Sequence, residues 1–403
     1  MAENGIIRGM KAPRLPNRKK CCGCGACRAS CPKGAIAMLP DEEGFLQPVV
    51  DAAKCVGCGK CEAVCPVLHP GKPRKPLAVY AAKAKDDELR WGSASGGVFT
   101  VLAQDVLKRG GVVFGAGFER PTWRVIHKAA TNEEELDDLR GSKYVQSDTG
   151  DTFKETKSYL DAGREVLYSG CPCQIAALKS FLRKNYPNLL TVDLICHGVP
   201  SPLAWSEYLK CHEGMARSSI VKIWSRRYHS WRKFSIQIDF VDDVLDSYSK
   251  EMYEDRFLAA FLREWIVRRR CYLCPFRQLR SGSDITIGDF WGVEKCHPDW
   301  EDEKGLSVVL INTEKGFPAA TSRLIEVKGA LSFDEACIAN NRKTLLENCR
   351  PSCFRPLFML GLKTFGFNAT FTAFDLIVKA FGRAHHTMWW IKRLVINREF
   401  NKF

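Results

Sequence analysis

The sequence has no apolar run long enough to cross a membrane. No stretch of about 18 uncharged apolar residues occurs in its 403 residues, so no membrane-spanning helix is expected. Residues 1–20 are basic and contain prolines, and they lack the apolar core of a secretory signal. The 19 cysteines are therefore expected to be reduced thiols in a cytoplasmic protein rather than disulfides.

The chain also lacks the signatures of several common functional classes. It has no serine-hydrolase elbow, no Walker loop and no G-x-G-x-x-G after a predicted strand. No helix-turn-helix or RNA-binding signature accompanies the net charge of +14, so no nucleic-acid partner is expected. Acidic proteins, anionic cofactors or anionic lipids fit this charge better.

What the chain does have is a cysteine pattern that occurs twice. The spacing C-x2-C-x2-C-x3-C-P occurs at Cys21, Cys24, Cys27 and Cys31, and again at Cys55, Cys58, Cys61 and Cys65. It is the spacing of bacterial two-cluster ferredoxins, in which the fourth cysteine of each run ligates the other cluster. We therefore expect two 4Fe–4S clusters, held by Cys21, Cys24, Cys27 and Cys65 (cluster 1) and by Cys55, Cys58, Cys61 and Cys31 (cluster 2). Two zinc sites are the alternative, and Cys22 is expected to be a bystander thiol.

Composition and periodicity divide the chain into segments. A basic extension (1–18) precedes a ferredoxin-type module (19–68). An extended spacer rich in Pro, Gly and Lys (69–76) leads to the main body. A basic aromatic tail (350–403) follows the body. Strands are predicted at 77–83, 165–169, 189–196, 219–225, 234–240, 284–289 and 307–312, and helices at 98–109, 153–160, 175–185 and 256–268. This alternation predicts an α/β or α+β body with a partly parallel sheet.

Six short motifs follow one another after residue 90. They are SASGG at 93–97, GSKYVQS at 141–147, GCPCQ at 170–174, CHGVPS at 196–201, C-x2-C at 271–274 and DITIGDFWG at 284–292. In this order they resemble the beta subunit of coenzyme F420 hydrogenase/dehydrogenase. The resemblance implies a mixed α/β flavin-binding oxidoreductase, with an N-terminal-like flavin domain over 77–165 and a C-terminal-like domain over 166–349. It also implies that FAD exchanges electrons with iron–sulfur clusters and a two-electron carrier, although use of the deazaflavin coenzyme itself does not follow.

Two of these motifs are the expected flavin site. The SASGG motif opens a predicted helix, whose free amides and dipole favour a phosphate, although an ordinary serine cap is the alternative. Lys143 would supply a charge for the phosphate, and Tyr144 a ring to stack on the isoalloxazine or the adenine. With the resemblance, the expected FAD-binding residues are Ser93, Ser95, Gly96, Gly97, Ser142, Lys143, Tyr144 and Gln146.

The later motifs supply candidates for a third cluster and for acid–base chemistry. The candidate ligands are Cys173, Cys196, Cys271 and Cys274. Cys171 competes with Cys173, because the family usually carries threonine or another residue at that position. Buried structural thiols or zinc are the alternatives. His197, at a strand end beside a candidate ligand, is the first acid–base candidate, and Asp289 is the second.

Two functions stay open at this level. The chain could be an oxidoreductase with its own small-molecule substrate, fed by an electron-carrier protein, or an electron-transfer subunit of a partner dehydrogenase or hydrogenase. A non-redox metal scaffold is a third reading. The tail has nine Lys or Arg against two Asp or Glu, and includes Trp389, Trp390, Lys392 and Arg393. It predicts either peripheral contact with anionic lipid or a helical cap on the body.

Overall fold

The computed structural model describes residues 12–225, 231, 234–241, 247–320, 322–347 and 351–399, without the side chains of 340, 343 and 381–399. Its strands are β1 Ile36–Pro40, β2 Leu46–Val50, β3 Ala78–Ala84, β4 Val112–Glu119, β5 Arg124–Ala130, β6 Val166–Gly170, β7 Leu189–Leu194, β8 Ile220–Ser225, β9 Ser235–Phe240, β10 Tyr248–Glu251, β11 Ile285–Asp289, β12 Ser307–Ile311 and β13 Ile325–Ala330. Its helices are α1 Ala26–Ser30, α2 Lys60–Ala63, α3 Asp87–Trp91, α4 Val98–Lys108, α5 Glu133–Asp137, α6 Thr152–Asp161, α7 Pro172–Leu182, α8 Pro202–Ala216, α9 Arg256–Leu262, α10 Arg269–Tyr272, α11 Val293–Cys296, η1 Pro298–Trp300, α12 Gly316–Ala320, α13 Phe333–Ala336, α14 Asn340–Leu345 and α15 Arg355–Glu399.

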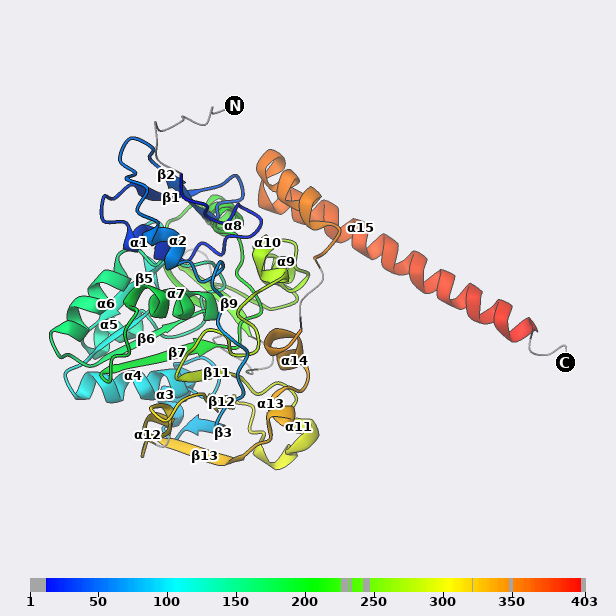
Figure 1. Ribbon diagram of the computed structural model, residues 1–403. Coiled ribbons are helices and arrows are strands. Elements are labelled where there is room, and N and C mark those ends of the chain that lie inside the picture. The colour runs from blue at the N-terminus through cyan, green and yellow to red at the C-terminus, as the bar shows by residue number, and fades with distance from the viewer. Residues whose placement is uncertain are drawn as a thin grey trace.

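A mixed sheet of eight strands, in the order β13-β3-β12-β11-β7-β6-β4-β5, forms the centre of the body (Figure 1). Strands β4, β6, β7 and β11 are parallel, whereas β5, β12, β3 and β13 pair antiparallel. The predicted mixed α/β fold with a partly parallel sheet is confirmed. Because β6, β7 and β11 run the same way, the segments that follow them meet at one edge of the sheet, where α/β proteins usually place ligands.

Both faces of this sheet are buried, as its continuous apolar strands predict. In β6, Leu167 packs into a core with α4, whereas Val166 and Tyr168 point into a core that includes α6 and α7. The second core also contains Ala26 and Ala29 of the ferredoxin-type module. The module is therefore packed against the sheet-covering helices and shares their hydrophobic core.

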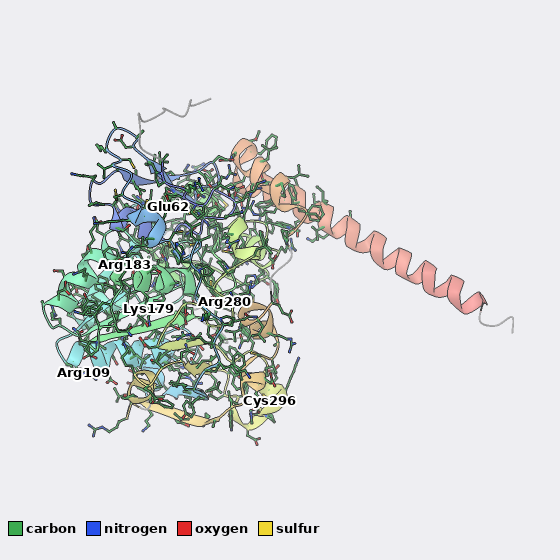
Figure 2. All side chains as sticks on the ribbon, in the orientation of Figure 1. Glu62, Arg109, Lys179, Arg183, Arg280 and Cys296 are labelled. Carbon is green, nitrogen blue, oxygen red and sulfur yellow. The ribbon has the colours of Figure 1, made fainter. Side chains whose placement is uncertain are left out.

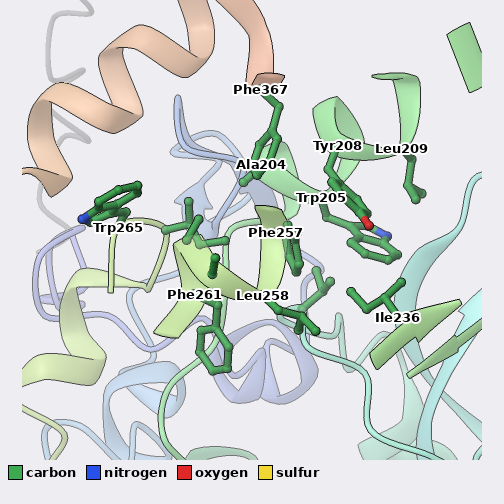
Figure 3. Close-up of a cluster of buried hydrophobic side chains, with 14 of the residues drawn as sticks. Ala204, Trp205, Tyr208, Leu209, Ile236, Phe257, Leu258, Phe261, Trp265 and Phe367 are labelled. Atoms are coloured by element: carbon green, nitrogen blue, oxygen red, sulfur yellow. The ribbon is translucent and has the colours of Figure 1, made fainter. Parts of the chain in front are cut away.

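Another hydrophobic core, separate from those on the faces of the large sheet, lies between the small antiparallel sheet β8–β9–β10 and helices α8, α9 and α15 (Figure 3). The predicted helix over 256–268 is too long, because α9 ends at Leu262 and Glu264 adopts a positive φ of 61°. This turn sends the buried Trp265 ring against Phe358 of α15, with ring centroids 5.1 Å apart. The first turns of α15 therefore cap the body, as the cap interpretation of the tail predicts.

Helix α15 is 45 residues long and is interrupted by a non-helical conformation at Gly366. Phe358, Phe367 and Phe371 are buried against the body, and Figure 1 shows the rest of the helix running away from it. The predicted lipid-contacting side chains, Trp389, Trp390, Lys392 and Arg393, lie outside the described side chains. In the part of the chain that the structure describes, no helix is long and apolar enough to span a bilayer.

The segment between the module and the sheet was expected to be an extended spacer, but it is fixed to the body. The Arg74 amide donates to the Gln278 carbonyl at 3.0 Å, and its Nε donates to the Leu279 carbonyl at 3.1 Å. A Cβ on Gly71 would lie 2.4 Å from the Arg280 carbonyl oxygen. Long-range contacts of this kind leave no trace in local composition, which is why a spacer was predicted.

Candidate functional site

The ferredoxin-type module has a hollow of about 430 Å³ whose lining includes Cys31, Cys55, Cys58 and Cys61. We call it the module hollow. It brings Cys31 of the first run together with three cysteines of the second, which are the four residues predicted for cluster 2. Cys58 is exposed, so this hollow opens to solvent. Glu62 of α2 also lines it and lies in the upper part of the molecule (Figure 2).

The four residues predicted for cluster 1, Cys21, Cys24, Cys27 and Cys65, form what we call the middle cysteine set. Burial raises the pKa of Cys27 to about 12, and neighbouring Cys21 and Cys65 add to the effect. Cys24 also neighbours Cys27. Crowded, buried thiols of this kind resist ionisation unless a cation stabilises the thiolates. The donor set therefore fits an iron–sulfur cluster.

A larger hollow, of about 680 Å³, lies at the carboxyl edge of the parallel strands. We call it the sheet-edge hollow. The cysteines that line it are Cys22, Cys173, Cys196, Cys271 and Cys274. The four predicted ligands of a third cluster, from three separate segments of the chain, are thus brought together. A hollow lined by thiols from separate segments of the chain fits an iron–sulfur cluster.

Cys171 and Cys22 also interact with the predicted ligands at this hollow. Cys171, the competing ligand, does not line the hollow, but its thiol interacts with that of Cys196. Cys22 was expected to be a bystander, but its thiol interacts with Cys24 of the middle set and with Cys173. Cys22 therefore connects the module to the sheet-edge hollow. Among the described residues, no three His, Cys, Asp or Glu side chains are arranged to hold a single metal ion.

The two acid–base candidates have different positions. His197 lines the sheet-edge hollow, with its Nε2 3.9 Å from Glu264 Oε1 and its ring nearly perpendicular to that of Phe261. Asp289 is not among the lining residues, and its backbone carbonyl accepts a hydrogen bond from Asn341 Nδ2 at 2.9 Å.

Asp193 is an acidic group at this hollow that sequence reasoning missed. It is 1% exposed and accepts hydrogen bonds of 2.5 Å from Ser281 Oγ and Thr286 Oγ1. Burial raises the pKa of its carboxyl. The available signal was one acidic residue inside the mostly apolar strand β7, since a buried strand rarely carries an acid without a partner or a function.

The predicted flavin turn, residues 93–97, is fastened to strand β12. The Gly96 amide donates to Ser307 Oγ at 3.0 Å, and Ser95 Oγ donates to the Leu306 carbonyl at 3.2 Å. Ser93 Oγ donates to the Leu89 carbonyl at 2.7 Å. A Cβ on Gly96 would lie 2.6 Å from the Ala82 carbonyl oxygen, so packing against β3 already requires glycine there. Gly97, with φ 77°, is the N-cap of α4, and no side chain caps this helix start with a hydrogen bond.

The second flavin motif, residues 141–147, follows Arg140, whose side chain extends toward this turn. Arg140 Nη1 is 4.0 Å from where a Cβ on Gly92 would lie, so the Arg140 side chain reaches the residue before the turn. Lys143 Nζ donates to the Arg140 carbonyl at 2.5 Å, and burial lowers the pKa of Lys143 to about 7. The Tyr144 ring stacks on Phe234 at 5.3 Å, and Ser142 is half-buried.

Gln146 is separate from this group. Its Nε2 donates to the Cys22 carbonyl at 2.9 Å, and its Oε1 accepts from Arg268 Nη1 at 2.7 Å. The amide nitrogen of its side chain therefore joins the body to the module, and the oxygen bonds Arg268, which also bonds the module.

Three family models match the chain. Residues 20–68 match the 4Fe-4S dicluster domain, residues 79–154 the N-terminal part of the coenzyme F420 hydrogenase/dehydrogenase beta subunit, and residues 163–330 its C-terminal part. Among solved structures, one chain of the F420-reducing NiFe hydrogenase complex from Methanosarcina barkeri aligns with a TM-score of 0.45 at 18% identity. The alignment covers 69% of this chain and 97% of the hydrogenase chain. Among curated proteins, none gives a match.

Proposed function

Because the chain belongs to the coenzyme F420 hydrogenase/dehydrogenase beta-subunit family, with a 4Fe–4S dicluster domain, we propose that it is an iron–sulfur flavoprotein oxidoreductase. When bound, the clusters would carry single electrons, and FAD would exchange them in pairs with a two-electron donor or acceptor, a deazaflavin-like coenzyme or another metabolite. The observation that carries this proposal is a continuous row of cysteines from the surface to the sheet edge.

The row begins at the module hollow, where Cys58 is exposed. Cys61 of that hollow neighbours Cys27 of the middle set. At the other end of the middle set, Cys24 neighbours Cys22, which interacts with Cys173 of the sheet-edge hollow. Thiols that neighbour one another in this order support electron passage through the protein in short steps. They also support the third 4Fe–4S cluster, with Cys173, Cys196, Cys271 and Cys274 as its ligands.

The residues expected at the flavin would bind and orient it. The amides at the start of α4 would face a phosphate, with Lys143 supplying positive charge, and Tyr144 would pack on a ring of the cofactor. The half-buried lysine fits an anion, because desolvation otherwise disfavours its charged form. Beside the sheet-edge hollow, His197 would hold or release a proton at Nε2, with Glu264 next to it.

The partner proposed for the module hollow is an acidic electron-carrier protein. Lys33 and Lys60 line this hollow and are exposed, and Lys54 is exposed beside Cys55. Positive charge around an exposed cluster site favours docking of an acidic carrier. The free cysteines suit a reducing compartment such as the cytoplasm.

The second candidate function is an electron-transfer subunit of a partner dehydrogenase or hydrogenase, without a substrate site of its own. The observation that favours it is the apolar surface on the first half of α15. Leu357 and Leu360 are each 61% exposed, and Phe365 is 71% exposed. Such a surface would suit a protein partner, and peripheral contact with a membrane is the other use it could have.

The proposal is tested by purifying the full chain anaerobically and measuring iron and flavin. We expect about twelve irons and one FAD per chain if all three clusters and the flavin are present. Cys31→Ser should remove about four irons, because Cys31 is the first-run ligand of the module hollow. Cys211→Ser, at a cysteine outside both hollows and the middle set, is the control. Zinc in place of iron, or no change in Cys31→Ser, would refute the proposal.

A further inference from the structure

Arg268 is a buried arginine at the boundary between the ferredoxin-type module and the body. Its side chain is 2% exposed. The Nε donates to the Cys21 carbonyl at 2.9 Å, Nη1 to Gln146 Oε1 at 2.7 Å, and Nη2 to the Leu46 carbonyl at 3.0 Å. The guanidinium also lies over the Phe45 ring, 5.1 Å from its centroid. All these partners are electrically neutral.

Two other fully buried arginines have carboxylate partners. Arg90 forms hydrogen bonds of 2.7 and 2.5 Å with Asp302, and Arg355 forms two with Glu43. Within the described residues, Arg268 forms no ion pair with an Asp or Glu side chain. A buried charge without a counter-charge is costly, so a cation in this position needs an anion that the polypeptide does not supply.

The position of Arg268 indicates which anions these are. It is the N-cap residue of α10, the helix that carries Cys271 of the sheet-edge hollow, and its own amide donates to the Val199 carbonyl at 3.0 Å. On its other side is Cys21 of the middle set. The Cys271 amide donates to the Arg268 carbonyl at 2.9 Å, so Arg268 contacts a ligand of each site.

The module approaches Arg268 as closely as the backbone permits. A Cβ on Gly23, where φ is 69°, would lie 2.9 Å from the Leu46 carbonyl oxygen and 2.7 Å from Arg268 Nη1. Only glycine fits this approach, which brings the loop of the middle set onto the guanidinium.

We infer that Arg268 is the shared counter-cation of two clusters, at the middle cysteine set and at the sheet-edge hollow, and that it raises the reduction potentials of both. This inference rests on the proposed iron–sulfur function. A cluster with four thiolate ligands is anionic, and each electron that it accepts adds one negative charge. A fixed positive charge nearby therefore stabilises the reduced form. Arg268 is a positioning and tuning residue between two redox sites.

The test compares Arg268→Met, Arg268→Lys and, as a matched buried control, Arg90→Met in the anaerobically purified full chain. Iron content and redox titrations followed by electron paramagnetic resonance are the readouts. Arg268→Met should shift the potentials of the middle and sheet-edge clusters to more negative values and leave the module-hollow cluster unchanged. Arg268→Lys keeps the charge and should stay close to wild type. Arg90→Met should not change any cluster potential, whatever it does to stability.

Full iron and wild-type potentials in Arg268→Met would overturn the inference. If Arg268→Met loses iron, the lysine variant decides. Retention of iron with near wild-type potentials in that variant supports a charge role, and a loss equal to that in Arg268→Met shows a purely structural one. If the wild type holds two clusters only, the third-cluster proposal fails, but comparison of the middle and module-hollow potentials still tests Arg268. A wild type without iron refutes the proposed function itself.

Discussion

Arg355 and Glu43, 312 residues apart in the chain, form a buried ion pair with two hydrogen bonds, Nη1 to Oε1 at 3.1 Å and Nη2 to Oε2 at 2.5 Å. The arginine opens helix α15, and the glutamate lies in the turn between β1 and β2 of the module. Burial by itself would raise the pKa of Glu43, but Arg355 and Arg269 hold it below its ordinary value. This pair fastens the C-terminal helix to the ferredoxin-type module.

Arg355→Met should therefore destabilise the protein by about 3 kcal/mol, because it leaves a buried carboxylate without its main partner. The measurement is equilibrium urea unfolding under anaerobic conditions. Arg263→Met breaks a partly exposed ion pair with Asp375 of α15. It should lower the free energy of unfolding by less than about 1 kcal/mol. Equal losses in the two variants would show that burial of the Arg355 pair contributes nothing special.

The two cysteines of the GCPCQ motif should differ in their effect on iron content. Cys173 lines the sheet-edge hollow, and Cys171 does not. We expect Cys173→Ser to lose about four irons per chain and Cys171→Thr to keep them, since a cubane needs its four ligands around one cavity. Iron analysis and electron paramagnetic resonance of the two variants distinguish the two thiols. Loss of iron in Cys171→Thr but not in Cys173→Ser would show that Cys171, and not Cys173, is the ligand.

Flavin binding should depend on pH through Lys143. In the flavin-free protein burial lowers the pKa of Lys143 to about 7, and a bound phosphate would raise it again. Binding then takes up a proton above pH 7, so the affinity for FAD should fall as pH rises, by up to about tenfold per pH unit. Titration of deflavinated protein with FAD at pH 6.5 and 8.5 measures this.

Lys143→Met should bind FAD more weakly and without this pH dependence. Lys154→Met, at an exposed lysine paired with Asp151, is the control and should behave as wild type. If Lys143→Met retains wild-type affinity at both pH values, this loop is not the phosphate site.

Acid should destabilise the fold through His127. Its ring is buried between Ser147 Oγ and the Ser169 carbonyl, and burial lowers its pKa from 6.5 to about 4. The unfolded chain binds a proton below pH 6.5 that the folded chain does not accept until about pH 4. Stability should therefore fall across this window, by about 1.4 kcal/mol at pH 5.5 from this residue alone.

Urea unfolding of wild type and His127→Gln at pH 7.5 and 5.5 checks this. The variant should lose less stability on acidification than wild type does. His69→Gln, at an exposed histidine, should lose as much stability as wild type does between pH 7.5 and 5.5. An unchanged pH dependence in His127→Gln would assign the acid sensitivity to other groups.

Local patterns in the sequence were sufficient for much of the central sheet. The strand predicted at 165–169 is β6, Val166–Gly170, and the one at 189–196 is β7, Leu189–Leu194, because apolar runs bounded by turns are strong local signals. Spacing also led to the module hollow, where the fourth cysteine of one run joins three of the other. Both kinds of information are contained within a few neighbouring residues.

The roles of Arg268 and Cys22 could not be read in this way. Each depends on contacts between segments far apart in the chain, such as the hydrogen bond from Arg268 to Cys21 over 247 residues. An arginine in a basic stretch is usually an exposed residue, and only its burial shows otherwise. The early end of α9 has the same origin, because Trp265 follows the packing of α15 rather than the helical periodicity.

The position of β3 has a consequence for synthesis of the protein on the ribosome. β3, Ala78–Ala84, pairs on one side with β12 and on the other with β13, both more than 200 residues later in the chain. The nascent strand therefore emerges long before either neighbour, with both edges open to incorrect pairing. Residues 79–154 cannot complete their part of the sheet alone, and the body closes only after translation has passed Ala330.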